Sequence, residues 1–226
     1  MTRYYGTSSV MVASLQLGPA VFTNQPARVE PLSAHGVKGI LGCDFLLRNH
    51  CVIDCLDRRL YVRAGATSPE VQRALDECLR ASGFHPVRLD LRPSLAATCD
   101  ARVNGQPVKL LVDTGAQWSM LDSSQVKRLG LAPVPTQGTI SGALSQIHPT
   151  RLSLTKIKTL EFESLTLPDL RFGVAAMADW GIRAPGLSDN EVHGVLGAYE
   201  LTVSGALIDC THFTLWLRPA ERRVKE

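Results

Sequence analysis

One carboxylate follows directly on a run of apolar residues that predicts a buried strand. Residues 108–112 form that run, and Asp113-Thr114-Gly115-Ala116 comes immediately after it. Threonine and glycine after an aspartate allow a sharp turn and a close approach of other backbone. Burial of a carboxylate is costly unless it is hydrogen-bonded or used in chemistry. Taken alone, the triplet favours a turn that ends a strand, so a reactive role for Asp113 has to come from the rest of the chain.

Composition limits the classes of protein to consider. The chain has 226 residues, of which 45% are hydrophobic and 20% charged, and its formal net charge is +3. These values describe one large globular domain or two small ones, with charge too low to predict nucleic-acid binding. No apolar run reaches the roughly 18 residues of a membrane span, and residues 10–17 alternate like a strand rather than a signal peptide. The cellular compartment stays open.

Metal and cofactor chemistry have little support in the sequence. The six cysteines and six histidines show no paired, closely spaced ligands of the kind that zinc requires. No glycine-rich phosphate loop precedes a predicted helix. We therefore expect no metal and no cofactor.

Hydrophobic periodicity predicts a mainly β chain with one prominent helix. Ser68, Pro69 and Glu70 form a helix start, and the apolar residues that follow share one face over about 69–82. Asn104-Gly105 predicts a hairpin that leads into the strand before Asp113. The other expected elements are strands at 9–17, 51–55, 59–63, 87–91, 96–103, 150–158, 160–167 and 170–176, and short helices at 44–48 and 122–130.

An internal repeat organises these elements. Residues 39–63 match residues 194–218 at nine of 25 positions without a gap. Further upstream, Leu15-Gln16-Leu17 is similar to Leu160-Glu161-Phe162. Such self-similarity indicates two copies of one structural unit. We expect the C-terminal half of a β unit at 1–65, a helical linker at 66–86, a complete unit at 87–219 and a basic tail at 220–226.

The order of these motifs resembles that of the retropepsin-like aspartic peptidases. The likeness rests on residues 111–116 (Leu-Val-Asp-Thr-Gly-Ala), 128–131 (Arg-Leu-Gly-Leu) and 194–197 (Gly-Val-Leu-Gly). It is closest to bacterial, tandem or two-lobed members. The resemblance implies an all-β, pepsin-like acid-protease barrel, with one complete lobe and the C-terminal half of a preceding lobe joined by a helix.

The resemblance also implies roles for particular residues. Asp113 would be the catalytic carboxylate, with Thr114, Gly115 and Ala116 supporting its loop: the Thr114 hydroxyl would brace an opposing loop, and Gly115 would permit the approach. A second segment would pass behind the catalytic turn, and a flap would close over the substrate. These two sets are Val195, Leu196 and Gly197 behind the turn, and Gly138, Thr139, Ile140, Ser141 and Gly142 in the flap.

The implied activity is endopeptidase hydrolysis of a polypeptide by a water molecule activated between two aspartates. Two close carboxylates share a proton, so that one accepts a proton from water while the other donates one. The sequence has one Asp-Thr-Gly. The second aspartate would come from a homodimer or from a missing N-terminal half-lobe. The alternative is a catalytically inactive module that binds peptides or promotes assembly.

The two copies differ after the second apolar-Gly element. The first copy has Gly-Cys-Asp-Phe-Leu at 42–46, which is close to the bacterial family pattern, whereas the second has Gly-Ala-Tyr-Glu-Leu at 197–201. We interpret the second version as a local structural change.

Overall fold

The structure is a computed structural model that describes residues 8–29, 37–63, 67–91, 96–140, 150–177 and 192–219. It divides the chain into two compact units. The smaller unit comprises Met1–Ile40 with Gly142–Gln146, and the larger one comprises Leu41–Ser141 with Ile147–Glu226.

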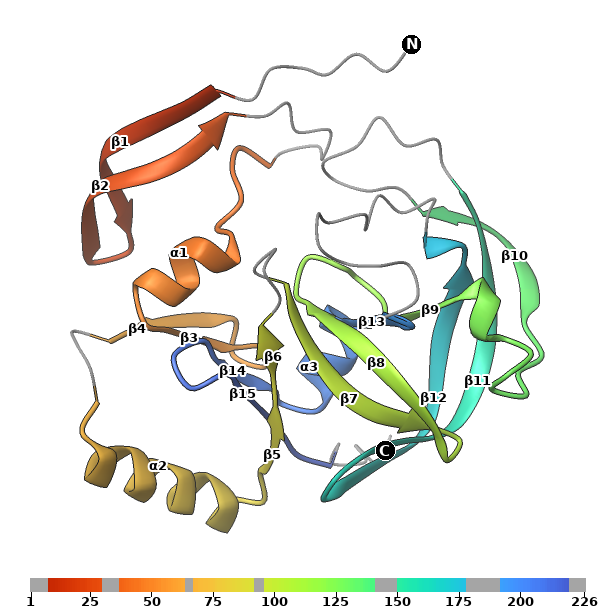
Figure 1. Cartoon of the computed structure of the whole chain (residues 1–226). Helices are drawn as coiled ribbons and strands as arrows, with labels where there is room; N and C mark the ends of the chain where they lie inside the picture. Colours follow the sequence, from red (N-terminus) through yellow and green to blue (C-terminus); the bar gives the residue numbers. More distant parts are fainter. Residues whose placement is uncertain are drawn as a thin grey trace, which may run out of the picture. The chain divides into compact units, whose positions relative to one another are not determined.

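The smaller unit contains an antiparallel hairpin. Strand β1 (Ser8–Leu17) pairs with β2 (Ala20–Val29), and Leu17 lies opposite Ala20 across the turn. Gly18 in that turn has φ +56°, a conformation that glycine adopts without strain. Neither strand contains a buried residue. The hairpin is drawn in red and orange in Figure 1.

The larger unit is built around a closed barrel. Its main sheet has the order β10-β11-β12-β9-β13-β8-β7-β6, and β11 also pairs with β7. This additional pairing closes a ring of six strands, β11-β12-β9-β13-β8-β7, which confirms the all-β barrel fold (Figure 1). The strands are β6 (Asp90–Leu91), β7 (Ala97–Val103), β8 (Gln106–Asp113), β9 (Met120–Asp122), β10 (Val134–Ile140), β11 (Thr150–Phe162), β12 (Leu165–Ala175) and β13 (Gly194–Gly197).

The barrel core follows from the strand periodicity. In β7 and β8, residues at alternate positions point inward, and Val103 and Leu110 are fully buried. Leu160 and Phe172 reach the same core from β11 and β12. Asn104 and Gly105 form the tight β7–β8 turn with φ of 49° and 78°. The predicted hairpin therefore delivers Asp113 at the end of a strand fixed by the core.

A second sheet joins the first predicted copy to the complete unit. Its order is β4-β3-β14-β15-β5. Strand β3 pairs with β14 in antiparallel fashion, with Ile53 opposite Ile208. The strands are β3 (Cys51–Asp54), β4 (Arg59–Val62), β5 (His85–Arg88), β14 (Leu207–Asp209) and β15 (Thr214–Leu217).

Within the described residues, three α-helices accompany the sheets: α1 (Cys43–Arg48), α2 (Pro69–Ala81) and α3 (Ala198–Val203). Helix α2 begins as the sequence predicts, because the Ser68 side chain accepts a hydrogen bond from the Val71 amide. Its apolar face is not buried, however. Val71 is 59% exposed and Leu75 is 40% exposed, and no residue of α2 is buried. The helix is thus a surface connection between β4 and β5.

Two other expectations of secondary structure are wrong. The short helix at 122–130 is only a 3₁₀ turn, Ser123–Gln125. Asp122 caps this turn at the Ser124 amide and also accepts a hydrogen bond from the Met177 amide, so its side chain ties the turn to the barrel. The three short strands expected at 150–176 are the two long strands β11 and β12. Their ladder extends from Ser153–Val174 to Phe162–Leu165, which keeps β11 continuous.

Equivalent elements recur at a constant spacing along the chain. Helices α1 and α3 are 155 residues apart at both ends, and so are β4 and β15. Two unusual positive φ angles recur at the same spacing: Arg58 and Phe213 have φ of 55° and 50°. The β1–β2 hairpin and the β11–β12 hairpin both have two residues between their strands, 145 positions apart. The two segments therefore share local conformation as well as sequence.

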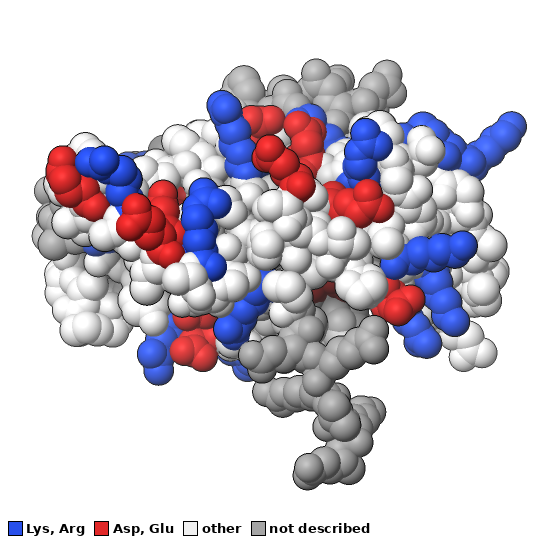
Figure 2. All heavy atoms as spheres, turned by 90° about the horizontal axis from the view of Figure 1, so that it is seen from below, with Lys and Arg blue, Asp and Glu red and all other residues white. Residues whose placement is uncertain are grey.

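Charges of both signs are interspersed on the face of the molecule drawn in Figure 2. Among the helices that the structure describes, none is long and apolar enough to cross a membrane.

Candidate active site

Asp113 is the last residue of β8 and is half-buried. Its Oδ1 accepts a hydrogen bond of 2.8 Å from the Gly115 amide, and its carbonyl accepts one of 3.3 Å from the Ala116 amide. This local geometry is an Asx turn. Thr114 and Gly115, which follow the carboxylate, are exposed. The core strand thus presents one carboxylate on a tight turn at the surface of the larger unit.

Strand β13 lies directly beside this turn. It runs parallel to β8, with Leu196 opposite Val112 and Gly197 opposite Asp113. Val195 and Leu196 are each 1% exposed. The segment 195–197 therefore lies beside the carboxylate-bearing turn, as the neighbouring strand of the barrel wall.

Gly197 is required by the closeness of this approach. A Cβ atom there would lie 2.5 Å from the carbonyl carbon of Trp118 and 2.9 Å from the carbonyl oxygen of Ala116. Both atoms belong to the backbone, which cannot move aside as a flexible side chain can. The corresponding position in the first segment is less constrained, because a Cβ on Gly42 would meet only the Asp44 side chain.

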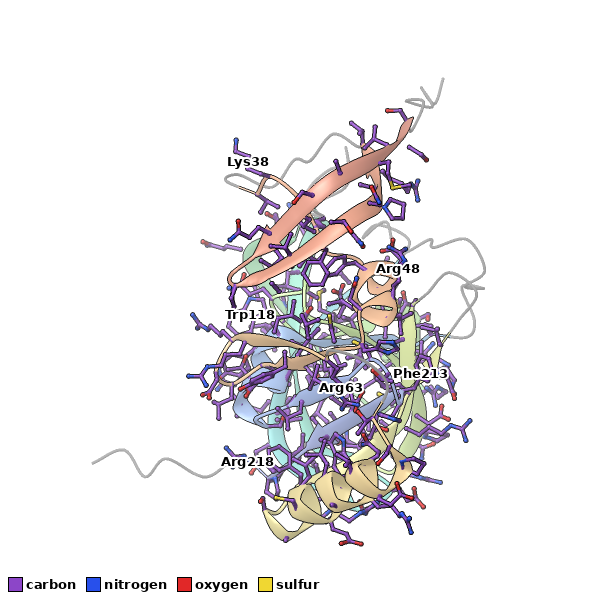
Figure 3. The ribbon with its side chains drawn as sticks, turned by 90° about the vertical axis from the view of Figure 1, so that its left-hand side faces the viewer. Lys38, Arg48, Arg63, Trp118, Phe213 and Arg218 are labelled. Atoms are coloured by element: carbon purple, nitrogen blue, oxygen red, sulfur yellow. The ribbon has the colours of Figure 1, made fainter. Side chains whose placement is uncertain are left out.

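The start of α3 is hydrogen-bonded to the chain that follows the turn. The Ala198 amide donates to the Ala116 carbonyl at 2.7 Å, and the Tyr199 amide donates to the Gln117 carbonyl at 3.2 Å. The rings of Trp118 and Tyr199 lie 5.1 Å apart between centroids. Trp118 is 47% exposed and lies near the surface (Figure 3).

Two residues that the sequence did not single out as site residues complete this arrangement. Glu200 and Ser119 are both buried, and Glu200 Oε2 accepts hydrogen bonds from the Ser119 amide and hydroxyl. Burial raises the pKa of Glu200, and the hydrogen bonds from Ser119 offset that rise only in part. The sequence feature that could have indicated this role is the difference between the two copies, because Glu200 stands in the second copy where Phe45 stands in the first.

A further residue missed by the sequence is Cys43, at the start of α1. Burial raises the pKa of its thiol, and the negative charges of Asp113 and then Asp44 raise it further. Cys43 is therefore within electrostatic reach of Asp113. The first-copy segment, and not only the barrel, contributes to the surroundings of the carboxylate.

The predicted flap residues belong partly to β10. Thr139 and Ile140 pair with Arg151 and Thr150 of β11, and the Gly138 amide donates to Thr136 Oγ1 at 3.1 Å. Ser141 and Gly142 lie outside the described residues. The structure thus shows part of the predicted hairpin in a strand pair whose register shifts between Pro135 and Thr139.

All six cysteines are free thiols. Within the described ranges, no group of three His, Cys, Asp or Glu side chains is arranged to hold a metal ion.

Comparison with known proteins finds a family similarity within this domain. Residues 99–199 match a family model described as aspartyl protease. This stretch contains Asp113, the supporting strand β13 and the start of α3. No curated protein matches the sequence.

Several solved structures are similar to the chain. A retropepsin-like aspartic protease from Rickettsia conorii has 17% identity and a TM-score of 0.37, over 60% of this chain and 88% of that one. The retroviral protease-like domain of Ddi1 from Leishmania major has 17% identity and a TM-score of 0.37, over 58% and 98%. The EIAV protease complexed with the inhibitor HBY-793 has 22% identity and a TM-score of 0.34, over 49% and 85%.

Part of the barrel domain is therefore similar in sequence to the aspartyl proteases, over the residues from β7 to the start of α3.

Proposed function

We propose that this chain supplies Asp113 to an aspartic endopeptidase whose second catalytic aspartate comes from a second β lobe. The observation that carries the proposal is the placement of Asp113. It stands on an accessible turn at the end of a core strand and is held by the Gly115 amide at 2.8 Å, beside Gly197. A carboxylate built into the fold in this way suits proton transfer, because its position is fixed by backbone rather than by a flexible loop.

The mechanism requires two carboxylates that share one proton. When they are held close together, both cannot ionise at low cost, so one is protonated while the other is ionised. The ionised group takes a proton from a water molecule that attacks the peptide carbonyl. The protonated group donates to the developing oxyanion, and the leaving nitrogen is protonated as the peptide bond breaks. Asp113 would serve as one of the two groups.

The second sheet suggests where the partner lobe binds. Strand β3 pairs with β14 so that Ile53 faces Ile208, its equivalent 155 residues later. Val52 faces Asp209, and Asp54 faces Leu207, so the ladder has local two-fold symmetry about the Ile53–Ile208 pair. A homodimer that used this edge of β14 would have to displace β3. The sheet therefore favours a half-lobe that completes the first copy.

The exposed side of the first copy supports the same conclusion. Tyr61 and Val62 of β4 are 46% and 36% exposed. Their equivalents in β15, Trp216 and Leu217, are 3% and 1% exposed, and the guanidinium of Arg80 from α2 lies over the Trp216 ring. Beyond β15 lies β5, whereas β4 ends the sheet. A partner lobe would add a strand to β4 and cover these two side chains.

The direct test is cleavage of a peptide library by the native polypeptide that contains this sequence, beside its Asp113→Asn variant. We expect the variant to lose about 10²–10⁴-fold in kcat/KM, the usual contribution of a general acid or base. Asp100→Asn is the matched control, because the Asp100 side chain is 76% exposed on β7 and pairs with Lys109. We expect it to retain activity.

Equal cleavage by Asp113→Asn and the wild type would reject Asp113 as catalytic. If the wild type cleaves no peptide but binds the library, the protein is the alternative, a peptide-binding module without catalysis.

A further inference from the structure

Glu200 is a buried carboxylate that the proposed peptidase chemistry does not use. It lies in the first turn of α3 and is 4% exposed. The equivalent position in α1 holds Phe45, which is 6% exposed. The same short helix therefore forms with an apolar ring at this position. Because a buried acid is costly, its presence in α3 calls for a specific set of contacts.

Two hydrogen bonds join the Glu200 carboxylate to Ser119. Glu200 Oε2 accepts one hydrogen bond from the Ser119 amide at 3.2 Å and another from the Ser119 hydroxyl. The same hydroxyl oxygen accepts a hydrogen bond of 2.8 Å from the Gly197 amide. A serine hydroxyl has one proton, so this proton points to Glu200 while the lone pairs face Gly197. Ser119 is fully buried, and hence water does not replace either partner.

This network fixes the segment that follows the catalytic turn. The chain from Ala116 to Ser119 is joined to the strand–helix junction at 197–200 by backbone hydrogen bonds at Ala116 and Gln117 and by Ser119 at its end. Gly197 lies opposite Asp113 in the β8–β13 pair. A shift of Ser119 would therefore move both the junction and the turn.

We propose that Glu200 is a positioning residue that orients Ser119 and thereby holds the Asp113 turn against Gly197. The inference rests on the proposed function for its catalytic consequence. Its structural content, the anchoring of residues 116–119 by one carboxylate oxygen, stands independently of that function.

Three variants test the proposal. Glu200→Gln keeps an acceptor oxygen of the same size and place, so it should preserve both bonds from Ser119. Glu200→Phe installs the side chain of the first copy and removes the acceptor. Ser119→Ala removes the bridging hydroxyl and leaves Glu200 in place, and it serves if the phenylalanine variant does not fold.

The first measurement is amide hydrogen exchange by NMR on the 226-residue chain. We expect exchange at Gly115, Ser119 and Gly197 to rise at least tenfold in Glu200→Phe and Ser119→Ala and less than threefold in Glu200→Gln. Amides of β7 and β11, which do not pair with β13, should stay unchanged, and this separates local release from general destabilisation. Unchanged exchange in Glu200→Phe, or an equal rise in Glu200→Gln, would overturn the proposal.

The second measurement is kinetic, on the native polypeptide. We expect kcat to fall about 10–100-fold in Glu200→Phe with little change in KM, because misplacement of the carboxylate weakens the transition state more than substrate binding. Glu200→Gln should stay within threefold of the wild type. Equal kcat in Glu200→Phe and the wild type would overturn the catalytic part. Absence of cleavage by the wild type would defeat the proposed function, while the exchange measurement would still decide the role of Glu200.

Discussion

Asp113 and Glu200 are two carboxylates of one site with opposite surroundings. Asp113 is half-buried on a surface turn, whereas Glu200 is almost fully enclosed by the barrel and α3. The Asp113 side chain is partly accessible to solvent, whereas the Glu200 side chain is buried within the protein. This difference predicts different responses to pH and to amide substitution.

The buried acid should make folding stability depend on pH. Burial raises the pKa of Glu200 in the folded state. A carboxyl group of this kind contributes most to stability below its unfolded-state pKa of about 4.3, and the contribution is lost as pH rises through the raised folded-state value. The glutamine in Glu200→Gln cannot ionise. The unfolding free energy of Glu200→Gln, measured by urea denaturation between pH 4 and 8, should therefore fall less toward the higher pH than that of the wild type.

Glu163→Gln is the control for this pH series, because Glu163 is exposed in the β11–β12 turn. It should leave the wild-type pH dependence intact. If the unfolding free energies of the wild type and Glu200→Gln changed in parallel with pH, ionisation of Glu200 would not contribute to the pH dependence of stability between pH 4 and 8.

The candidate site was predictable from sequence to the extent that local rules determine it. An apolar run followed by Asp-Thr-Gly predicts a carboxylate on a turn, and the structure has Asp113 there. Glu200 could not be assigned a contact, since its partner Ser119 is 81 residues away and the pairing depends on how β13 packs beside β8. The proximity of Cys43 to Asp113 could not be predicted for the same reason, because it depends on strand pairing in the second sheet.

At the scale of elements, one ion pair joins the first copy to the complete unit. Arg63 follows β4 (Figure 3). Its guanidinium binds the carboxylate of Asp209, the last residue of β14, at 2.7 Å. These side chains are 16% and 4% exposed. Burial would raise the pKa of Asp209, but hydrogen bonds from His212 and the charge of Arg63 lower it overall. The equivalent arginine, Arg218, instead lies over the Phe84 ring at 5.2 Å.

Because Arg63 and Arg218 have different partners, we expect equivalent substitutions of the two to lower the free energy of unfolding by different amounts. Arg63→Met should lower the free energy of unfolding by about 3–5 kcal/mol, because it leaves the buried Asp209 carboxylate without its cation. Arg218→Met should cost only about 1 kcal/mol, the value of an arginine–ring contact near the surface. Urea denaturation of both variants checks the difference. Similar losses in the two would mean that the Arg63–Asp209 pair does not hold the copies together.

Helices and strands were predicted correctly where the local sequence pattern agreed with the burial of the side chains in the structure. The predictions were wrong where the two disagreed. Ser68 and Pro69 set the start of α2, but the apolar face that its periodicity shows remains exposed at Val71 and Leu75. Conversely, Asp122 and Gln125 have the spacing of a helix start, yet Asp122 belongs to β9 and is fixed by the barrel. In both cases the outcome depends on packing between residues that are far apart in the sequence, and a local sequence pattern does not contain that information.

At the scale of the whole molecule, β4 is the strand where a partner lobe should bind. Tyr61→Lys should weaken activity of the native polypeptide at least tenfold, because it places a charge where the partner would bury an aromatic ring. It should change the unfolding free energy of the 226-residue chain by less than about 0.5 kcal/mol, as exposed substitutions usually do. Peptide cleavage and urea denaturation measure the two effects.

Val134→Lys is the matched control, since Val134 is 66% exposed on β10, an edge strand of the main sheet, whereas β4 belongs to the second sheet. It should leave cleavage unchanged. If Tyr61→Lys were as active as the wild type, or if sedimentation showed a stable homodimer of this chain unaffected by Tyr61→Lys, the second lobe would bind elsewhere.

The pairing of β3 with β14 also has a consequence for biosynthesis. Residues 51–54 leave the ribosome long before residues 207–209, so in the early hairpin β3–β4 the edge of β3 that pairs with β14 stays open until β14 has been translated. Unpaired strand edges are the usual starting points of aggregation in nascent chains. Slow translation before residue 209 would prolong that exposure. The yield of folded protein should therefore depend on how soon residues 207–209 are translated after residues 51–54.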